Sequence, residues 1–350
     1  MKLTTPVRAV AGGLVAAAGI RYGFNSVATF GFTRAISNRP YGQAKRVSAE
    51  GLIGVEDIAI DQERGVAYLS AADRRRERNC DKKKVGGLFR YDLTTPDATP
   101  ERISDDDIYP HGISLWCAPD GHRELYAIDH ADTGERVRRY RIDDSGLQLV
   151  EVFRHELIRS PNDLTVVGDR EFYVTNDHKF TSDAAQNVEH FLRLPLSDVV
   201  HFEGGNYQVA LRNVPYANGI VWEPVRKKVF VAALSRREVW SCDVTADGRL
   251  VKRWAFTTDM AVDNIEIGTD GKLWIGGHPK VLDLVRHDKD MTHLSPSEVI
   301  AMDPDTGTVT TVYENDGSEI SGSSVGANWR NRLLVGSVME PFILDCTLST

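Results

Sequence analysis

From about residue 45 to its end, the chain alternates short apolar runs with polar and glycine-containing punctuation. Runs of this length and composition predict β-strands separated by turns. Six of the runs start with a polar residue, and these leaders recur at intervals of roughly 45 to 60 residues. The leaders are Glu56, His111, Asn162, Asn218, Asp263 and Ser323. A second apolar run follows shortly after each leader, beginning at Val66, Leu125, Phe172, Val229, Leu273 and Leu333.

A repeat of short strands with this period is typical of a β-propeller. The innermost strand of each blade lines the central channel, so six leaders in equivalent positions would form a ring around one axis. Helical periodicity is expected only at residues 281–292. We therefore predict an all-β, six-bladed propeller. Its last strand, around Phe342, is expected to pair with a strand near residues 46–55, because closure removes exposed sheet edges.

The first 45 residues carry no repeat, and we interpret them as an N-terminal extension of a single catalytic domain at residues 46–350. Within them, residues 9–20 are uncharged and mostly apolar, and Lys2 and Arg8 precede them. This length suits a signal-peptide core or a short anchor and is too short to span a bilayer. An ordinary extension is equally compatible with the sequence. Secretion, membrane association through this segment and an intracellular location all stay open.

Charge narrows the choice of partners. The formal net charge of −8 argues against nucleic acid as the main partner. One basic cluster, residues 74–84, runs against this trend, and we interpret it as a solvated loop. The four cysteines, at positions 80, 117, 242 and 346, have no spacing typical of a metal site. A small-molecule ligand of the channel is therefore the expected partner, and the oligomeric state stays open.

The predicted ring is rich in oxygen ligands. Carboxylates come from Glu56 and Asp263, and amide oxygens come from Asn162, Asn218 and Asn264. This set favours a hard cation, and its mixture of charged and neutral oxygens suits Ca²⁺ better than Mg²⁺. Two formal negative charges balance one Ca²⁺, so the acids need not be buried unpaired.

A second pair of acids follows one position behind the ring, at Asp57 and Asp163. Adjacent residues of a strand point to opposite faces, so these acids cannot simply duplicate the first site. They either bind a second, deeper cation with help from a backbone carbonyl or cap local turns. The sequence leaves both readings open.

Taken together, these motifs closely resemble the paraoxonase family of calcium-dependent lactonases and arylesterases, within the wider gluconolactonase- and strictosidine-synthase-like propellers. The resemblance runs in order from about residue 45 to the end of the chain. The matching motifs are Val-Glu-Asp-Ile at 55–58, Pro-His-Gly-Ile-Ser at 110–114, Pro-Asn-Asp at 161–163, Asn-Asp-His at 176–178, Ala-Asn-Gly-Ile at 217–220, Val-Asp-Asn-Ile at 262–265, Gly-His-Pro at 277–279 and Gly-Ser-Ser-Val at 322–325.

The resemblance implies a six-bladed propeller with two calcium ions in its central channel. A catalytic calcium would be held by Glu56, Asn162, Asn218, Asp263 and Asn264. A structural calcium would be held by Asp57, Asp163 and the backbone carbonyl of Ile113. The family's histidine dyad falls on His111 and His130.

Two departures from the family pattern are visible. Cys346 matches one partner of the family's disulfide, but no cysteine precedes Cys80, so this bond is expected to be absent. Residues 71–86 correspond to a mobile flap over the site in the family, and here they are strongly basic. Substrate preference is therefore not predictable from the resemblance.

The expected reaction is hydrolysis of lactones and aryl esters, with Ca²⁺ polarising the carbonyl and His111 activating water while His130 orients it or relays the proton. Asp263 could serve as the base instead. The segment 322–326 matches the Gly-x-Ser-x-Gly motif of serine hydrolases, but its context is polar and the last histidine, His293, lies upstream. A gluconolactonase-like sugar lactonase and a non-enzymatic, calcium-stabilised binding module both stay open as functions of such a propeller.

Overall fold

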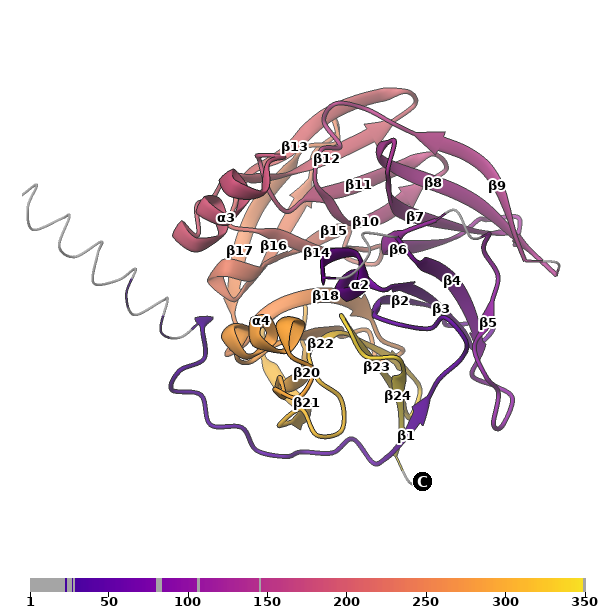
Figure 1. Ribbon diagram of the computed structural model, residues 1–350. Helices are drawn as coiled ribbons and strands as arrows, with labels where there is room; N and C mark the ends of the chain where they lie inside the picture. Colours follow the sequence, from indigo (N-terminus) through magenta and orange to yellow (C-terminus); the bar gives the residue numbers. More distant parts are fainter. Residues whose placement is uncertain are drawn as a thin grey trace, which may run out of the picture.

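The computed structural model describes residues 29–79, 84–105, 108–144 and 146–348, together with Gly23 and Val27. In this part of the chain the strands form six four-stranded antiparallel sheets. Figure 1 shows the sheets arranged like blades around a central axis, with the strands that open each repeat innermost. The fold is the predicted six-bladed β-propeller. The proposed extension upstream of residue 29 lies almost wholly outside the described residues.

Five blades are each built from four consecutive strands. The first two comprise β2 (Val55–Asp61), β3 (Val66–Ala72), β4 (Gly86–Asp92) and β5 (Glu101–Arg102), then β6 (Pro110–Cys117), β7 (Arg123–Ala131), β8 (Gly134–Asp143) and β9 (Gly146–Phe153). The next two comprise β10 (Pro161–Gly168), β11 (Glu171–Asn176), β12 (Ser197–Glu203) and β13 (Asn206–Val214), then β14 (Ala217–Glu223), β15 (Lys228–Ala233), β16 (Glu238–Val244) and β17 (Leu250–Thr257). The fifth comprises β18 (Ala261–Ile267), β19 (Leu273–His278), β20 (Ser297–Met302) and β21 (Val309–Asn315).

The sixth blade closes the ring with strands from both ends of the chain. It combines β22 (Ser323–Trp329), β23 (Arg332–Ser337) and β24 (Ile343–Thr347) with β1 (Gln43–Val47). In this antiparallel pairing Val47 lies opposite Ile343 and Gln43 opposite Thr347. The predicted closure is confirmed, with the N-terminal partner starting slightly earlier than expected. Upstream, Arg34 adds ion pairs to Glu298 and Glu314 at 2.9 and 2.8 Å, which fasten the segment before β1 to the fifth blade.

Apolar side chains fill the space between neighbouring blades. In one cluster Leu69 and Phe89 of the first blade pack with Val325 and Leu334 of the sixth, and all four are fully buried. Five further clusters of this kind lie between or within blades of the described propeller. Burying apolar surface contributes about 25 cal/mol per Å², so these contacts are the main source of the free energy that stabilises the propeller.

Every innermost strand has an irregularity in its pairing close to its start. The register with the second strand shifts between Val55 and Asp57 in β2 and at the corresponding place in β6, β10, β14, β18 and β22. The residues inside these shifts are Glu56, His111, Asn162, Asn218, Asp263 and Ser324, four of them with the residue that follows. A β-bulge of this kind re-aims side chains, which turns the leaders toward the axis.

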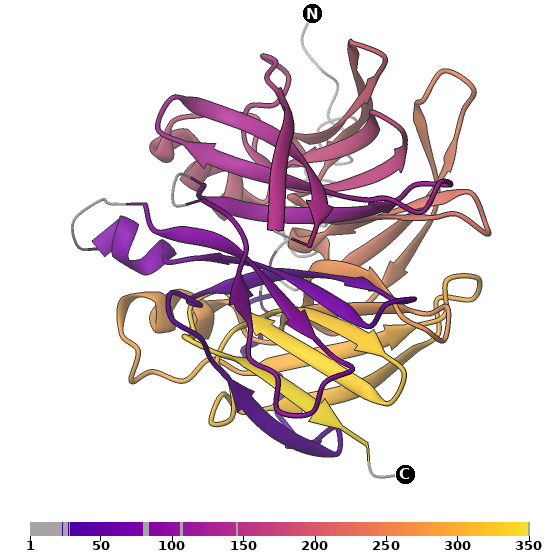
Figure 2. The same ribbon diagram turned by 90° about the vertical axis from the view of Figure 1, so that its right-hand side faces the viewer.

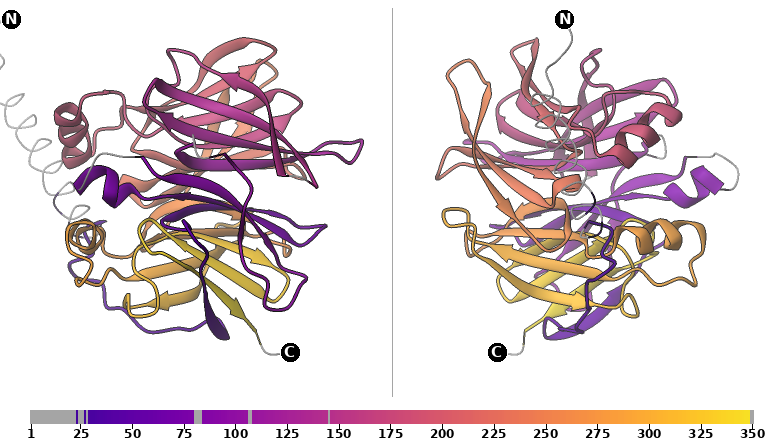
Figure 3. Two further views of the ribbon diagram at one scale, coloured as in Figure 1. Left: turned by 45° about the vertical axis from the view of Figure 1, so that its right-hand side comes forward. Right: turned by 90° about the vertical axis from the view of Figure 1, so that its left-hand side faces the viewer.

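Three helices lie on one end of the propeller (Figures 2 and 3). They are α2 (Arg74–Asn79), α3 (Asp183–Leu192) and α4 (Val281–Lys289), inserted between the second and third strands of the first, third and fifth blades. Because the second strand ends where the innermost strand begins, this placement brings all three helices to the end where the polar leaders lie. No described helix is long and apolar enough to cross a membrane.

The helix at 281–289 is confirmed, whereas α3 has no counterpart in the sequence prediction. The interpretation of the basic cluster as a solvated loop is wrong for residues 74–79, which form α2. Arg74 and Arg75 are half-buried, and Arg75 Nη2 donates to the carbonyl of His287 at 2.6 Å. Contacts to α4 therefore hold this helix in place. Lys82 and Lys83 of the cluster lie outside the described residues.

Candidate metal and catalytic site

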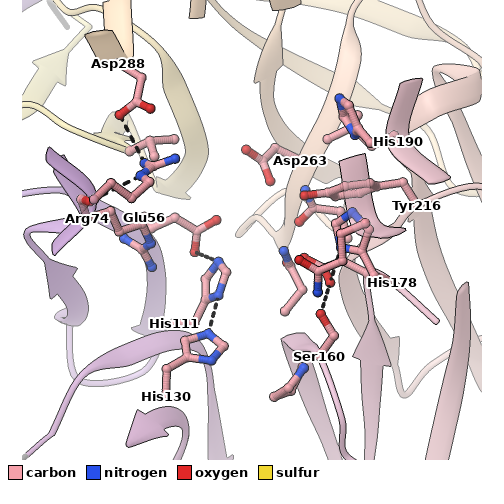
Figure 4. Close-up of a pocket in the computed structure, with 18 of the residues that line it drawn as sticks. Glu56, Arg74, His111, His130, Ser160, His178, His190, Tyr216, Asp263 and Asp288 are labelled. Atoms are coloured by element: carbon pink, nitrogen blue, oxygen red, sulfur yellow. Dashed lines mark hydrogen bonds and ion pairs between the residues drawn. The ribbon is translucent and has the colours of Figure 1, made fainter. Parts of the chain in front are cut away.

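A cavity of about 990 Å³ opens at the helical end of the channel. Four of the six leaders that were expected on the axis line it, namely Glu56, Asn162, Asn218 and Asp263, and so does His111; Figure 4 labels Glu56, His111 and Asp263. These four leaders, together with Asn264 next to Asp263 in β18, are called the floor. Residues of α2, α3 and α4 form part of the rim of the cavity. The fold thus brings together side chains that are far apart in the sequence, such as Glu56 and Asp263, which are 207 positions apart.

Five oxygens on this floor have no hydrogen-bond partner in the described residues. They are Glu56 Oε2, Asn162 Oδ1, Asn218 Oδ1, Asp263 Oδ1 and Asn264 Oδ1. All five side chains are buried, with at most 4% exposed. Leaving one such oxygen unpaired costs about 1–3 kcal/mol. The set of carboxylate and amide oxygens is of the kind that a hard cation prefers.

Neighbouring contacts hold these unpartnered oxygens in place. Asn264 Nδ2 donates to Glu56 at its carbonyl and at Oε1, at 2.9 and 3.0 Å, which leaves Asn264 Oδ1 without a competing donor. His278 Nε2 lies 2.8 Å from Asp263 Oδ2, so the other oxygen of that carboxylate stays available. Burial raises the pKa of Asp263 above its ordinary value, although His278 opposes the shift.

Asp57 and Asp163 are buried just behind this floor, and each accepts two backbone N–H groups. Asp57 bonds Ile58 N at 2.8 Å and Ile113 N at 2.7 Å. Asp163 bonds Leu164 N and Ile220 N, both at 2.7 Å. Burial, reinforced by the neighbouring Glu56 charge, raises the pKa of Asp57 to about 8. These acids link the innermost strands of neighbouring blades, and Ile113 meets Asp57 through its N–H group.

The predicted histidine dyad is in contact. His111 Nδ1 lies 2.8 Å from His130 Nε2, and His111 Nε2 lies 3.5 Å from Glu56 Oε2. Burial lowers the pKa of His111, which favours a neutral ring at neutral pH even though Glu56 acts in the opposite direction. The imidazole pair therefore joins the carboxylate floor to the cavity wall.

Glu135 extends the dyad and was missed in the sequence. Its Oε2 lies 2.5 Å from His130 Nδ1, and the two residues are paired across the β7–β8 hairpin. An ionised carboxylate only accepts hydrogen bonds, so Nδ1 of His130 carries the proton and Nε2 accepts from Nδ1–H of His111. In this order His111 Nε2 carries no proton, and it lies on the side of Glu56, 3.5 Å from Oε2. The spacing of Glu135 in a short hairpin was the signal that could have found it.

Two further histidines of the motifs line the cavity without an assigned role, His178 and His278. His178 Nδ1 lies 2.8 Å from Asp177 Oδ1, and Ser160 Oγ donates to the same carboxylate. Because that hydroxyl bonds the acid rather than an imidazole, Ser160 is not arranged as an activated nucleophile. Tyr216 also lines this side with a positive φ of 61°, an uncommon backbone conformation for a bulky residue.

Ser323 proves to be a structural residue, one position away from the ring. Its Oγ donates to the carbonyl of Gly277 at 3.0 Å. Ser324 occupies the bulge of β22, and its Oγ donates to the carbonyl of Glu56 at 2.7 Å. The sixth blade thus supports a ligand of the ring through a backbone contact.

Two glycines explain why the inner strands can approach so closely. A Cβ at Gly112 would lie 2.3 Å from Asp163 Oδ1, and a Cβ at Gly219 would lie 2.4 Å from the carbonyl of Asp263. Both positions therefore exclude any side chain. The Asn218–Gly219 pair, which resembles a hairpin turn in isolation, lies inside β14.

Comparison with known proteins agrees with this geometry. A sequence profile described as arylesterase matches residues 79–348, most of the chain. The chain belongs to the arylesterase family. Human serum paraoxonase/arylesterase 2 is 31% identical to this arylesterase-family protein over 267 residues, covering 73% of this chain and 75% of the human protein. Rat serum paraoxonase/arylesterase 1 is 30% identical over 302 residues, covering 82% and 84%.

Solved structures similar to this arylesterase-family protein share its fold. A candidate gluconolactonase superposes with a TM-score of 0.56 at 16% identity, over 89% of this chain and 96% of that protein. Regucalcin, a calcium-binding protein from Agrobacterium tumefaciens, superposes with a TM-score of 0.52 at 12% identity, over 89% and 94%. At these identities the likeness concerns the propeller alone.

The cysteines in the described part of the chain are free thiols, namely Cys117, Cys242 and Cys346. Cys346, which matches a half-cystine of the family, is buried in β24. Cys80 lies outside the described residues. In this arylesterase-family protein the β1–β24 pairing fastens the two ends of the described propeller.

Proposed function

We propose that the protein is a calcium-dependent hydrolase of lactones and aryl esters. The observation that carries the proposal is the set of five buried, unpartnered oxygens from Glu56, Asn162, Asn218, Asp263 and Asn264 on the cavity floor. Carboxylate and amide oxygens without nitrogen or sulfur ligands are the donor set of calcium. Family membership supports ester hydrolysis as the reaction.

Bound Ca²⁺ would supply polarisation of the substrate carbonyl and stabilisation of the negative charge that develops on its oxygen. His111 would remove a proton from the attacking water at Nε2, the nitrogen left unprotonated by the hydrogen-bond order of the dyad. His130 and Glu135 would hold that order and stabilise the imidazolium that forms, through contacts of 2.8 and 2.5 Å. A neutral His111 is required, so activity should fall on the acid side of neutrality.

For Asp57 and Asp163 we propose a second, structural calcium ion. Both carboxylates are buried and together carry more negative charge than their four backbone N–H donors neutralise. Their role as links between strands and a role as ligands are compatible, because each carboxylate oxygen has two lone pairs.

The proposed activity is tested with a panel of alkyl lactones, a sugar lactone, aryl esters and organophosphate triesters, each assayed with and without a calcium chelator. We expect chelator-sensitive turnover of the alkyl lactones and aryl esters. A strong preference for the sugar lactone would favour a gluconolactonase-like activity instead. Inactivity across the panel in folded, calcium-loaded protein would favour a non-enzymatic binding module.

Replacing His111 by glutamine is expected to lower kcat for a lactone by about 10²- to 10⁴-fold, the usual range for loss of a general base. Calcium affinity and Tm should change little, because His111 is not among the five unpartnered ligands. His293→Gln is the matched control, since His293 lies outside the cavity lining. Near-normal turnover by His111→Gln would assign the base to another group, with Asp263 as the first candidate.

A further inference from the structure

Each carboxylate on the cavity wall has a basic side chain nearby, whereas one cation on the described wall has no carboxylate bonded to it. Six carboxylates line the cavity, and each has a cation or histidine within 4.0 Å. These pairs are Glu56–His111, Glu77–Lys84, Glu135–His130, Asp177–His178, Asp263–His278 and Asp288–Arg78. Arg159, also on the wall, pairs with Asp198 at 2.6 Å.

Arg74 is the exception among the described residues that line the cavity. Its guanidinium contacts only three backbone carbonyls, those of Gly54, Ala72 and Pro110, at 3.4, 3.5 and 3.3 Å. These distances exceed the usual 2.7–3.2 Å of a good N–H···O bond, so the donors remain available for a stronger acceptor. The side chain is half-buried, and its charge is therefore only partly compensated by water.

The Arg74 guanidinium lies beside residues that are proposed to take part in the reaction. Figure 4 shows Arg74 next to Glu56, and its charge lowers the pKa of both Glu56 and His111. Helix α2 is held against α4 through the Arg75 contacts, so Arg74 projects from a supported element. An anion bound to Arg74 would share the cavity with Glu56 and His111.

We propose that Arg74 is a specificity-determining residue and that its guanidinium binds a carboxylate carried by the lactone or ester substrate. This inference rests on the hydrolase activity proposed above and names its substrate class. A guanidinium presents two parallel N–H donors that match a carboxylate. A guanidinium without a directly bonded carboxylate matches a monoanion, because a dianion would meet the six wall carboxylates with its second charge. Val281, Leu284 and Val285 of α4 supply an apolar wall for the rest of the molecule.

The test compares two γ-butyrolactones that differ only in a ring substituent, a carboxylate in one and a carboxamide in the other. The full-length, calcium-loaded protein should hydrolyse the carboxylate with a kcat/KM at least about 10-fold higher. Arg74→Gln should lower kcat/KM for the carboxylate by roughly 10- to 100-fold and that for the carboxamide by less than about threefold, since a charge-assisted pair is lost only in the first case. Arg74→Lys should retain part of the preference, because it keeps the charge without the fork.

Arg76→Gln is the matched control, because Arg76 is exposed on the same helix and absent from the cavity lining. Its carboxylate preference should equal that of the wild type. If Arg74→Gln lowered kcat/KM equally for both lactones, the proposed role of Arg74 would be wrong. The same would follow if the wild type hydrolysed the carboxamide as well as the carboxylate. Either result would leave the hydrolase activity itself unaffected. Absence of turnover for both lactones in folded, calcium-loaded protein would instead overturn the hydrolase activity and this inference with it.

Discussion

Replacing Asp263 by alanine is expected to lower kcat/KM for a lactone by a factor on the order of 10³ or more and to weaken calcium binding. A bound cation contributes several kcal/mol of transition-state stabilisation, and each 1.36 kcal/mol is a factor of ten. Asp263 supplies one of two carboxylates on the cavity floor, and its Oδ1 has no other described partner. The loss should occur whether His111 or Asp263 is the base. Steady-state kinetics and a calcium titration measure the two effects.

Asp263→Asn separates the charge of this residue from its ability to bind a metal ion, because it keeps one ligand oxygen and removes the negative charge. Asp259→Asn is the matched control, since Asp259 is exposed four positions upstream and lies outside the cavity lining. It should leave activity and calcium affinity unchanged. If Asp263→Ala bound calcium and hydrolysed lactones like the wild type, the assignment of the floor as a catalytic metal site would be wrong.

Removing calcium with a chelator is expected to lower Tm at pH 7.5 by roughly 5 to 10 °C, because any ligand that binds only the folded state stabilises it by mass action. Without a cation, the five buried oxygens of the floor and the two buried acids behind it would lack the positive charge proposed to balance them. Differential scanning calorimetry with and without added Ca²⁺ measures the shift. Adding Mg²⁺ at the same concentration should raise Tm less than Ca²⁺ does, because Mg²⁺ prefers a smaller and more regular set of ligands.

The Tm of the metal-free protein should also depend on pH, in a direction set by Asp57. Burial raises the pKa of Asp57 to about 8 in the metal-free fold, whereas an unfolded aspartate titrates near 4. The folded state thus holds a proton that the unfolded state has released, and this contribution is fully present below about pH 4 and lost as pH rises through 8. Metal-free Tm should therefore fall between pH 5 and 8, and Asp57→Asn should reduce the fall. A metal-free Tm that is constant over this interval would contradict the raised pKa.

The polar ring was predictable because a propeller imposes a repeat on the sequence. Each blade must place one residue at the axis, so Glu56, Asn162 and Asp263 appear in phase although they lie far apart along the chain. The family resemblance added His130, which lies on a second strand and outside the periodic series. Local signals in the innermost strands were thus sufficient to locate the floor of the cavity.

The walls of the cavity were less predictable, for reasons that differ between elements. Helix α3 begins after Ser182, whose side chain makes no capping hydrogen bond, so the usual start signal is present in the sequence without its contact. Helix α2 is a short run of charged residues whose position depends on contacts to α4. Glu135 pairs with His130 across the β7–β8 hairpin, and its spacing of five residues was a local signal that could have found it. The contacts between α2 and α4 join residues far apart in the sequence, which a single sequence does not encode locally.

The bulges in the innermost strands have a consequence for how such a site can change over evolutionary time. Residues inside a bulge, such as Glu56 and Asn162, lie outside the regular pairing with the second strand. The regular pairing of β2 and β10 with their second strands therefore does not depend on the side chains of Glu56 and Asn162. Substitutions at these positions alter the ion and the chemistry while the blades keep their hydrogen bonds, so the frame and the reaction it supports are free to diverge separately.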